Sequence, residues 1–366
     1  MPNDNGFTIE NGVLKKYKGK GGIVTIPDDI SNSVTEIGES AFSRCSSLTN
    51  ITIPNSVKEI GDSAFSFCSS LTKIVIPNSV TTIGDGAFED CSSLTDITIP
   101  NGVTAIGNNA FAGCINLTNI TIPNSVITIG EEAFNVCTGL KNIVIPNSVT
   151  TIEDRAFYYC RSLTKIVIPN SVKKIGDWAF KDCSSLTDIT IPNSVKTIGA
   201  SAFDGCINLT KIVIPNSVTT IGDWAFSYCI SLTKIVIPNS VKEIGERAFE
   251  CCSSLKYIEI SNSVTTIGKE AFYKCAKLTE IEIPNSVKEI GDKAFLDCSS
   301  LTDITIPDSV TKIGENIFAG CSNLKNIKAP AGFKDTLPEK LKKQVKFTVY
   351  NEKKQKYTIL NSCCIE

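Results

Sequence analysis

The sequence predicts an α/β repeat solenoid of about fourteen short parallel strands, with short helical or 3-10 stubs on the opposite face. Two observations predict this fold. Cysteine recurs thirteen times at an unbroken spacing of 23, from Cys45 to Cys321, and each of these cysteines follows a phenylalanine by three residues. Within each unit, a segment of period two is followed by a segment of helical period. One such unit cannot bury its own apolar face, so the units must stack.

The strand is the first element of each unit, which reads L-T-x-I-x-I-P-N-S-V-x-x-I-G-(D/E)-x-A-F-x-x-C-S-S. In residues 48–54, "LTNITIP", apolar and polar residues alternate, so Ile51 and Ile53 are expected to point inward. Pro54 has no N–H to donate and ends the strand, and Asn-Ser then makes the turn.

The second element is predicted in residues 60–71, "IGDSAFSFCSSL", where the period changes. Its apolar residues fall on one side of a helical wheel, so a stub of one or two helical turns is expected to cover the core. These residues are Ala64, Phe65, Cys68 and Leu71.

Three parts are predicted along the chain: an N-terminal cap over 1–22, repeats over 23–330, and a C-terminal cap with a basic tail over 331–366. A stack of repeats needs covered ends. Asn11-Gly12 lies between alternating apolar residues and predicts a hairpin in the first cap. In the last part, "DTLPEKLKKQV" and "KFTVY" are expected to form a helix and a strand.

The repeat pattern resembles that of BspA-like leucine-rich repeats, which occur in bacterial surface proteins and in some protists. The motif L-x-x-I-x-I-P…I-G-x-x-A-F-x-x-C carries the resemblance over roughly residues 23–330. It implies a right-handed leucine-rich-repeat solenoid, a role in binding or adhesion, and a location at the cell surface or outside the cell.

Charge and hydropathy narrow the classes of function. The formal net charge is −2, so the chain as a whole is no polycation, and no nucleic-acid partner is expected. No stretch reaches the roughly 18 apolar residues of a membrane span, and residues 1–22 lack a signal-peptide core. If the sequence is full length, a cytoplasmic location follows.

The cysteine ladder allows four interpretations. Zinc needs closely spaced ligand pairs, and a catalytic thiol needs a base, yet the chain has no histidine. Disulfides need side chains that face each other, whereas one column of a solenoid points in parallel. Core packing beside phenylalanine is the favoured interpretation. Accordingly we expect no metal, no cofactor and no enzymatic activity, and we expect the thiols outside the ladder to react more readily: Cys251, Cys363 and Cys364.

An acidic residue usually follows the repeat glycine, as at Asp62, Asp85 and Asp292. A row of carboxylates can indicate calcium, but calcium wants several oxygens converging on one point. Capping of free N–H groups at the start of each stub is the favoured interpretation.

Binding is expected on exposed columns that vary between repeats, and there are two candidates. The first is the outward face of the sheet, where leucine-rich repeats generally bind partners. The same residues would also suit a solvated sheet of good strand formers. The column comprises Asn142, Val144, Lys165, Val167, Asp188, Thr190, Lys211, Val213, Lys234, Val236, Tyr257 and Glu259.

The second candidate is a flank of aromatic and arginine side chains, the types enriched at binding hot spots. They come from the position before Ala-Phe and from the position four residues later. The alternative is that the rings only shield the core. The residues are Arg155, Tyr159, Trp178, Trp224, Tyr228 and Arg247.

The predicted function is a non-enzymatic binding or adhesion module, monomeric, whose solenoid surface meets a protein ligand such as a host or matrix protein. The alternative is an intracellular or lipid-anchored scaffold. The last four residues, "CCIE", have the C-a-a-X form, so Cys363 is a candidate for lipidation although Glu is not a usual final residue. A membrane is a partner only if Cys363 is lipidated.

Overall fold

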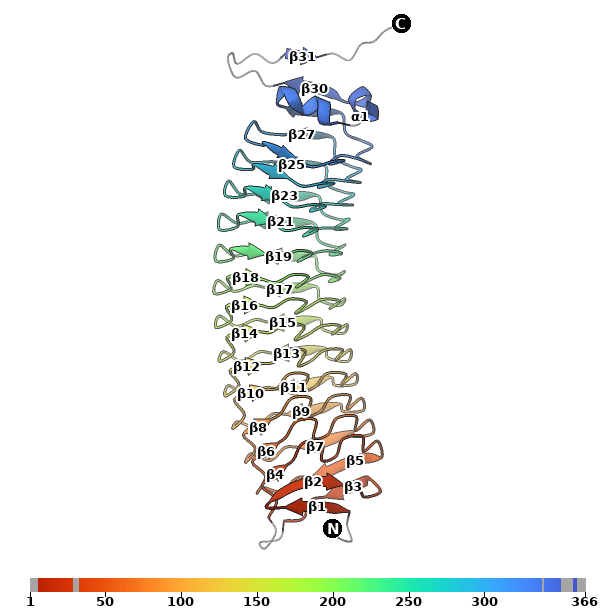
Figure 1. The fold of residues 1–366 in the computed structure, drawn as a ribbon, viewed down its shortest axis with the longest axis vertical. Coiled ribbons are helices and arrows are strands. Elements are labelled where there is room, and N and C mark those ends of the chain that lie inside the picture. Colours follow the sequence, from red (N-terminus) through yellow and green to blue (C-terminus); the bar gives the residue numbers. More distant parts are fainter. Residues whose placement is uncertain (1–5, 29–32, 338, 350–357, 361–366) are drawn as a thin grey trace. The chain divides into compact units, whose positions relative to one another are not determined.

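The computed structural model describes residues 6–28, 33–337, 339–349 and 358–360. The chain forms two compact units, Met1–Ser194 and Val195–Glu366. Within each unit, the repeats are stacked as successive turns of a parallel β-solenoid (Figure 1). The predicted repeat solenoid, with about 14 turns in all, is thereby confirmed.

In unit 1, each repeat contributes two strands instead of the one predicted. The longer strands carry the sequence signal and pair in parallel, for example Asn142 with Lys165 and Val144 with Val167. The second strand of each repeat is only two residues long, which is too short to show a period. After the N-terminal pair β1 (Phe7–Glu10) and β2 (Val13–Tyr17), the longer strands are β3 (Gly22–Thr25), β5 (Leu48–Thr52), β7 (Lys73–Val75), β9 (Asp96–Thr98), β11 (Asn119–Thr121), β13 (Asn142–Val144), β15 (Lys165–Val167) and β17 (Asp188–Thr190), and the short ones are β4 (Glu36–Ile37), β6 (Glu59–Ile60), β8 (Thr82–Ile83), β10 (Ala105–Ile106), β12 (Thr128–Ile129), β14 (Thr151–Ile152) and β16 (Lys174–Ile175).

Unit 2 repeats this arrangement and ends in a different way. The final repeats pair β25, β27, β29 and β30 in parallel, and β31 then pairs antiparallel with β30. The longer strands are β19 (Lys211–Val213), β21 (Lys234–Ile237), β23 (Tyr257–Ile260), β25 (Glu280–Glu282), β27 (Asp303–Thr305), β29 (Asn326–Ala329), β30 (Lys346–Val349) and β31 (Thr358–Leu360), the short ones are β18 (Thr197–Ile198), β20 (Thr220–Ile221), β22 (Glu243–Ile244), β24 (Thr266–Ile267), β26 (Glu289–Ile290) and β28 (Lys312–Ile313), and the helices are η1 (Ala331–Thr336) and α1 (Glu339–Gln344).

The predicted helical stubs are turns, so this part of the prediction is wrong. In the second full repeat, Ser63 and Phe67 have positive φ angles of 52° and 58°, which a right-handed helix excludes. Alternate N–H groups bond within the repeat, as from Ala64 to Gly61, and those between them bond to the next repeat, as from Phe65 to Ala87. A helix would use all of these groups for its own i to i−4 bonds.

The core follows the predicted columns. Ring centroids of Phe65 and Phe88 are 5.4 Å apart in unit 1, and those of Phe226 and Phe249 are 5.5 Å apart in unit 2. The ladder cysteines are buried beside them, apart from the half-buried Cys45. None of the described cysteines is in a disulfide. Ladder thiols donate to the carbonyl of the phenylalanine 26 residues earlier, for example Cys137 Sγ to Phe111 O at 3.1 Å.

The acidic column also has a structural role, although it differs from the one predicted. Asp62 Oδ1 accepts the N–H of Asp85 at 2.8 Å, and Asp292 Oδ1 accepts the N–H of Glu315 at 2.8 Å. Each side chain therefore caps the equivalent backbone group of the next repeat rather than the start of its own stub. This pairing explains why an acceptor recurs here.

The predicted end elements are present. β1 and β2 form an antiparallel hairpin through Asn11 and Gly12, whose φ angles of 50° and 78° suit the expected tight turn. A short helix and a strand follow the last repeat, as expected, in α1 and β30. The division into caps and repeats at residues 22 and 330 stays a prediction. Cys363 and Cys364 lie outside the described residues.

Candidate binding surfaces

The predicted sheet face of unit 1 is exposed. β13, β15 and β17 align Asn142, Lys165 and Asp188 in one column and Val144, Val167 and Thr190 in the next. Both columns point away from the core, and the two valines are 70% and 54% exposed. The chain thus leaves a row of apolar side chains in solvent on an otherwise polar sheet.

The predicted sheet face of unit 2 is exposed as well. Val213, Val236 and Tyr257 are 59%, 40% and 41% exposed. The register of β21 and β23 places Lys234 beside Tyr257, and the Lys234 ammonium lies 4.8 Å from the centre of the ring. This cation–π contact shows that the Tyr257 ring offers its face to a positive charge.

The sheet face of unit 2 continues beyond the residues that the sequence analysis selected. A hollow of about 650 Å³ lies over β23, β25, β27, β29 and β30. The same outward positions of the repeat motif supply its lining, so extending the column past Glu259 would have found it. The polar residues of the lining are Tyr257, Glu259, Glu280, Glu282, Asp303, Thr305, Asn326, Lys328, Lys346 and Thr348.

On the flank of unit 1, Arg155 is held by its own chain. Its Nη1 lies 2.9 Å from Glu132 Oε1, and its guanidinium lies 4.7 Å from the centre of the Trp178 ring. Tyr159 packs edge-on against Tyr158 at 4.5 Å. The three predicted residues are half-buried, and they form two small contact groups.

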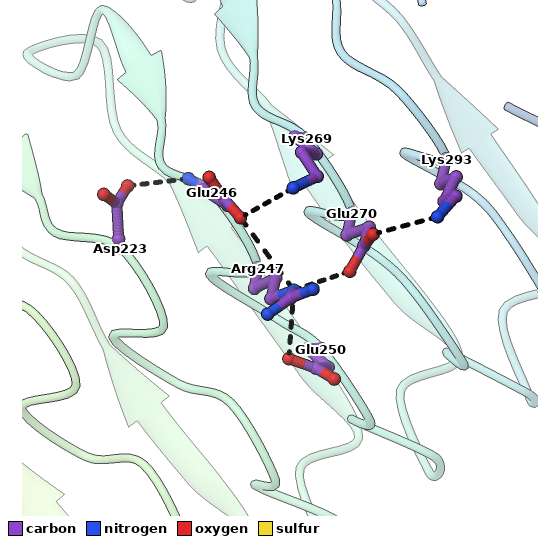
Figure 2. Close-up of polar contacts among 7 residues, drawn as sticks. All are labelled: Asp223, Glu246, Arg247, Glu250, Lys269, Glu270 and Lys293. Carbon is purple, nitrogen blue, oxygen red and sulfur yellow. Dashed lines mark hydrogen bonds and ion pairs between the residues drawn. The ribbon is translucent and has the colours of Figure 1, made fainter. Parts of the chain in front are cut away.

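On the flank of unit 2, Arg247 is the centre of a charged network (Figure 2). Its Nε lies 2.5 Å from Glu270 Oε2 and 3.8 Å from Glu250 Oε2, and its guanidinium lies 5.7 Å from the centre of the Trp224 ring. The Glu270 side chain is only 6% exposed and also lies 3.6 Å from Lys293. Glu270 occupies the same repeat position as Arg247 and was not among the predicted flank residues.

The pKa values of the two acids Glu270 and Glu250 in this network are shifted in opposite directions. Burial acts to raise the pKa of Glu270, but the hydrogen bond and charge of Arg247, with Lys269 and Lys293, outweigh it, so this pKa lies below its usual value. Burial raises the pKa of Glu250. The network therefore keeps Glu270 ionised inside the flank, which is a structural role.

Tyr228 and Cys251 lie together beside a second, largely apolar hollow of about 570 Å³. Tyr228 is 49% exposed, and the Cys251 thiol is half-buried and hydrogen-bonded to its hydroxyl. Burial raises the pKa of Cys251, while Tyr228 and Lys274 act to lower it. Among the ladder thiols, burial raises the pKa of Cys68 to about 12.

Two further properties concern the described residues as a whole. No group of three or more His, Cys, Asp or Glu side chains within them is arranged to hold a metal ion. No helix in the described segments is long and apolar enough to cross a membrane.

The model of the BspA type leucine rich repeat region matches residues 24–126, 104–233 and 220–341. The chain belongs to this family. Members of the family and fold are repeat scaffolds that generally mediate protein interaction or adhesion and are generally non-enzymatic. No curated protein matches the chain.

Solved structures of bacterial proteins are similar to this BspA-type chain. A leucine-rich repeat protein from Bacteroides ovatus shares 34% identity over 94% of this chain and 97% of its own, with a TM-score of 0.77. A leucine rich cell surface protein from Faecalibacterium prausnitzii shares 29% identity over 91% of this chain and 96% of its own, with a TM-score of 0.52.

Proposed function

We propose that this BspA-type chain is a non-enzymatic adhesion module that acts at the cell surface and binds a protein ligand, such as a host or matrix protein, through its outward sheet face. The observation that carries the proposal is the row of exposed valines on that face. The F. prausnitzii relative, described as a cell surface protein, supports the location.

The exposed apolar column is the part of the surface with most to gain from a partner. In unit 1, Val144 and Val167 are each more than half exposed, while the isoleucines and cysteines of the core behind them are buried. Burying apolar surface yields roughly 25 cal/mol per Å², so a row of such side chains can supply binding free energy. The flanking lysines and acids can orient the partner on the sheet. The flank clusters stay a predicted surface of second rank. Their arginines already have partners within the chain, so they have less to gain from a ligand.

Binding of the full chain to a panel of purified extracellular-matrix proteins tests the proposal. The Val144→Glu/Val167→Glu variant should lose at least about tenfold in affinity, because it places charge in the apolar row. The matched control is Thr82→Glu/Thr128→Glu, which adds the same charge to exposed positions on the other sheet of unit 1. It should bind like the parent chain.

Equal binding by the parent and valine variants, with unchanged circular dichroism, would remove the sheet face as the binding surface. Trp178→Ser and Trp224→Ser test the flank in the same assay. If only these tryptophan variants lose binding, the flank rather than the sheet face is the binding surface.

A further inference from the structure

We propose that the hollow over β23 to β30 in unit 2 takes an extended protein segment that carries Arg or Lys side chains. The proposal rests on the proposed function and adds the chemical class of the partner at one part of the same face. The observations that carry it are the charge of the hollow, the state of its carboxylates and its shape.

Four carboxylates line the hollow. Glu280 and Asp303 are direct neighbours across β25 and β27, and Glu259 and Glu282 come from the second outward position of β23 and β25. Adjacent strands are about 4.8 Å apart, so like charges on neighbouring strands repel each other and destabilise the sheet. A bound cation would remove that repulsion.

Three of these carboxylates lack the neutralisation that acids elsewhere in unit 2 receive. Glu289 lies 2.6 Å from Lys312 Nζ, and Glu246 lies 3.4 Å from Lys269 Nζ. Within the described part of the chain, no lysine or arginine forms an ion pair with Glu259, Glu280 or Glu282. Their side chains are exposed and negative, and they face the hollow.

The shape of the hollow favours an organic cation over a metal ion. The carboxylates are spread over three strands, and no three of them converge among the described residues. Calcium needs several oxygens at one point, whereas guanidinium and ammonium groups satisfy separated carboxylates through several N–H donors. With a volume of about 650 Å³, the hollow has room for the side chains of a short peptide segment.

The residues at the two ends of the hollow limit where the basic side chains of a bound segment can lie. Tyr257 borders one end, where the face of its ring already meets the Lys234 ammonium, so a further cation is disfavoured there. Lys328 and Lys346 border the other end. A segment with acidic residues beyond its basic ones would suit both ends.

Fluorescence anisotropy with the full chain tests the proposal. The probe is a labelled peptide of about nine residues that alternates Arg with Thr, compared with the same peptide carrying Glu in place of Arg. The Arg peptide should bind, and its affinity should fall as NaCl rises from about 50 to about 500 mM. The Glu280→Gln/Glu282→Gln variant should weaken binding by at least about tenfold.

The matched control is Glu36→Gln/Glu59→Gln. These two acids are parallel neighbours on the other sheet of unit 1, and their substitution changes the net charge by the same amount. This control should remain within about twofold of the parent affinity. Equal binding of the Arg and Glu peptides, or unchanged binding by Glu280→Gln/Glu282→Gln, would overturn the proposal.

Two outcomes separate this inference from the proposed function. If matrix binding depends on Val144 and Val167 but the Arg peptide does not bind, the adhesion function stands and the cationic segment is refuted. If light scattering shows a dimer that dissociates in the Glu280→Gln/Glu282→Gln variant, the occupant of the hollow is a second copy of this chain, and the inference is likewise overturned.

Discussion

Removing the guanidinium at position 247 should leave a buried carboxylate without its main partner. Arg247 is 32% exposed, but Glu270 is 6% exposed and lies 2.5 Å from it. Breaking a fully buried ion pair by removing one partner costs about 3–5 kcal/mol. Because Arg247 is partly solvated and Lys293 still lies 3.6 Å from Glu270, we expect Arg247→Met to lower the free energy of unfolding by about 2 kcal/mol.

Tryptophan fluorescence in urea measures this effect in the correct unit. The chain has two tryptophans, one in each unit, so Trp178→Phe leaves Trp224, beside Arg247, as the reporter. In this background, Arg247→Met/Glu270→Gln should recover most of the loss, because the double variant no longer buries an unpaired charge. The matched control is Arg155→Met in a Trp224→Phe background, where Trp178 is the reporter. It should cost about 1 kcal/mol, because Glu132 is 24% exposed.

The reasoning is refuted if Arg247→Met costs no more than Arg155→Met. It is also refuted if Glu270→Gln fails to rescue Arg247→Met. Either result would mean that solvent, rather than Arg247, neutralises Glu270.

Three other predictions follow from burial and titration. Because the pKa of Glu270 is lowered in the folded state, its ionised carboxylate stabilises unit 2 at pH values above the unfolded-state pKa of about 4.3. This stability is lost as the pH falls through the folded-state pKa. The free energy of unfolding measured against pH should show that loss, and Glu270→Gln should flatten the curve in that range. Among the described thiols, Cys251 should react first with a thiol reagent under native conditions, as peptide mapping would reveal, and labelling of most buried ladder thiols at the same rate would contradict a closed core. Cys137→Ala removes a buried sulfur and its bond to Phe111 O, so it should cost about 1–2 kcal/mol in urea unfolding, and a cost near zero would show that the ladder thiols contribute nothing.

The repeat and its core could be predicted because the residue types of the buried positions recur in thirteen copies of the motif. Phe65, Cys68 and Leu71 are fully buried as expected, since burial depends on apolar character and stacking rather than on the local backbone. The outward sheet positions followed from the alternation in L-x-x-I-x-I.

The local backbone after the glycine could not be predicted from the same pattern. Ala64, Phe65, Cys68 and Leu71 share one side of a helical wheel, and the left-handed residues Ser63 and Phe67 are neither glycine nor asparagine. The signal comes only from other repeats, where Gly86 and Gly113 occupy the same two positions and also have positive φ angles. Stacking determines their conformation, because their N–H groups bond to the next repeat. The helical wheel therefore predicted correctly which side chains are buried, but the helical backbone that it implied is wrong.

The flank interactions were hidden for a related reason. Arg155 and Arg247 were predicted to present hot-spot side chains, but their nearest groups, Glu132 and Glu270, come from the repeat before in one unit and from the repeat after in the other. Residues 23 apart in the sequence are neighbours in a solenoid, so aligning the variable columns as vertical pairs would have exposed both contacts. The hollow near β25 was missed because the column was not followed to its end.

The backbone capping by Asp62 and its counterparts has a consequence for how this protein changes length. Each of these aspartates accepts the N–H of the residue at the same position one repeat later, so the repeats that carry an aspartate here offer matching connections to their neighbours. Duplication or loss of a whole 23-residue segment by recombination would restore those connections without any compensating substitution. Selection can therefore alter the reach of the protein in discrete steps, while the outward residues diverge independently.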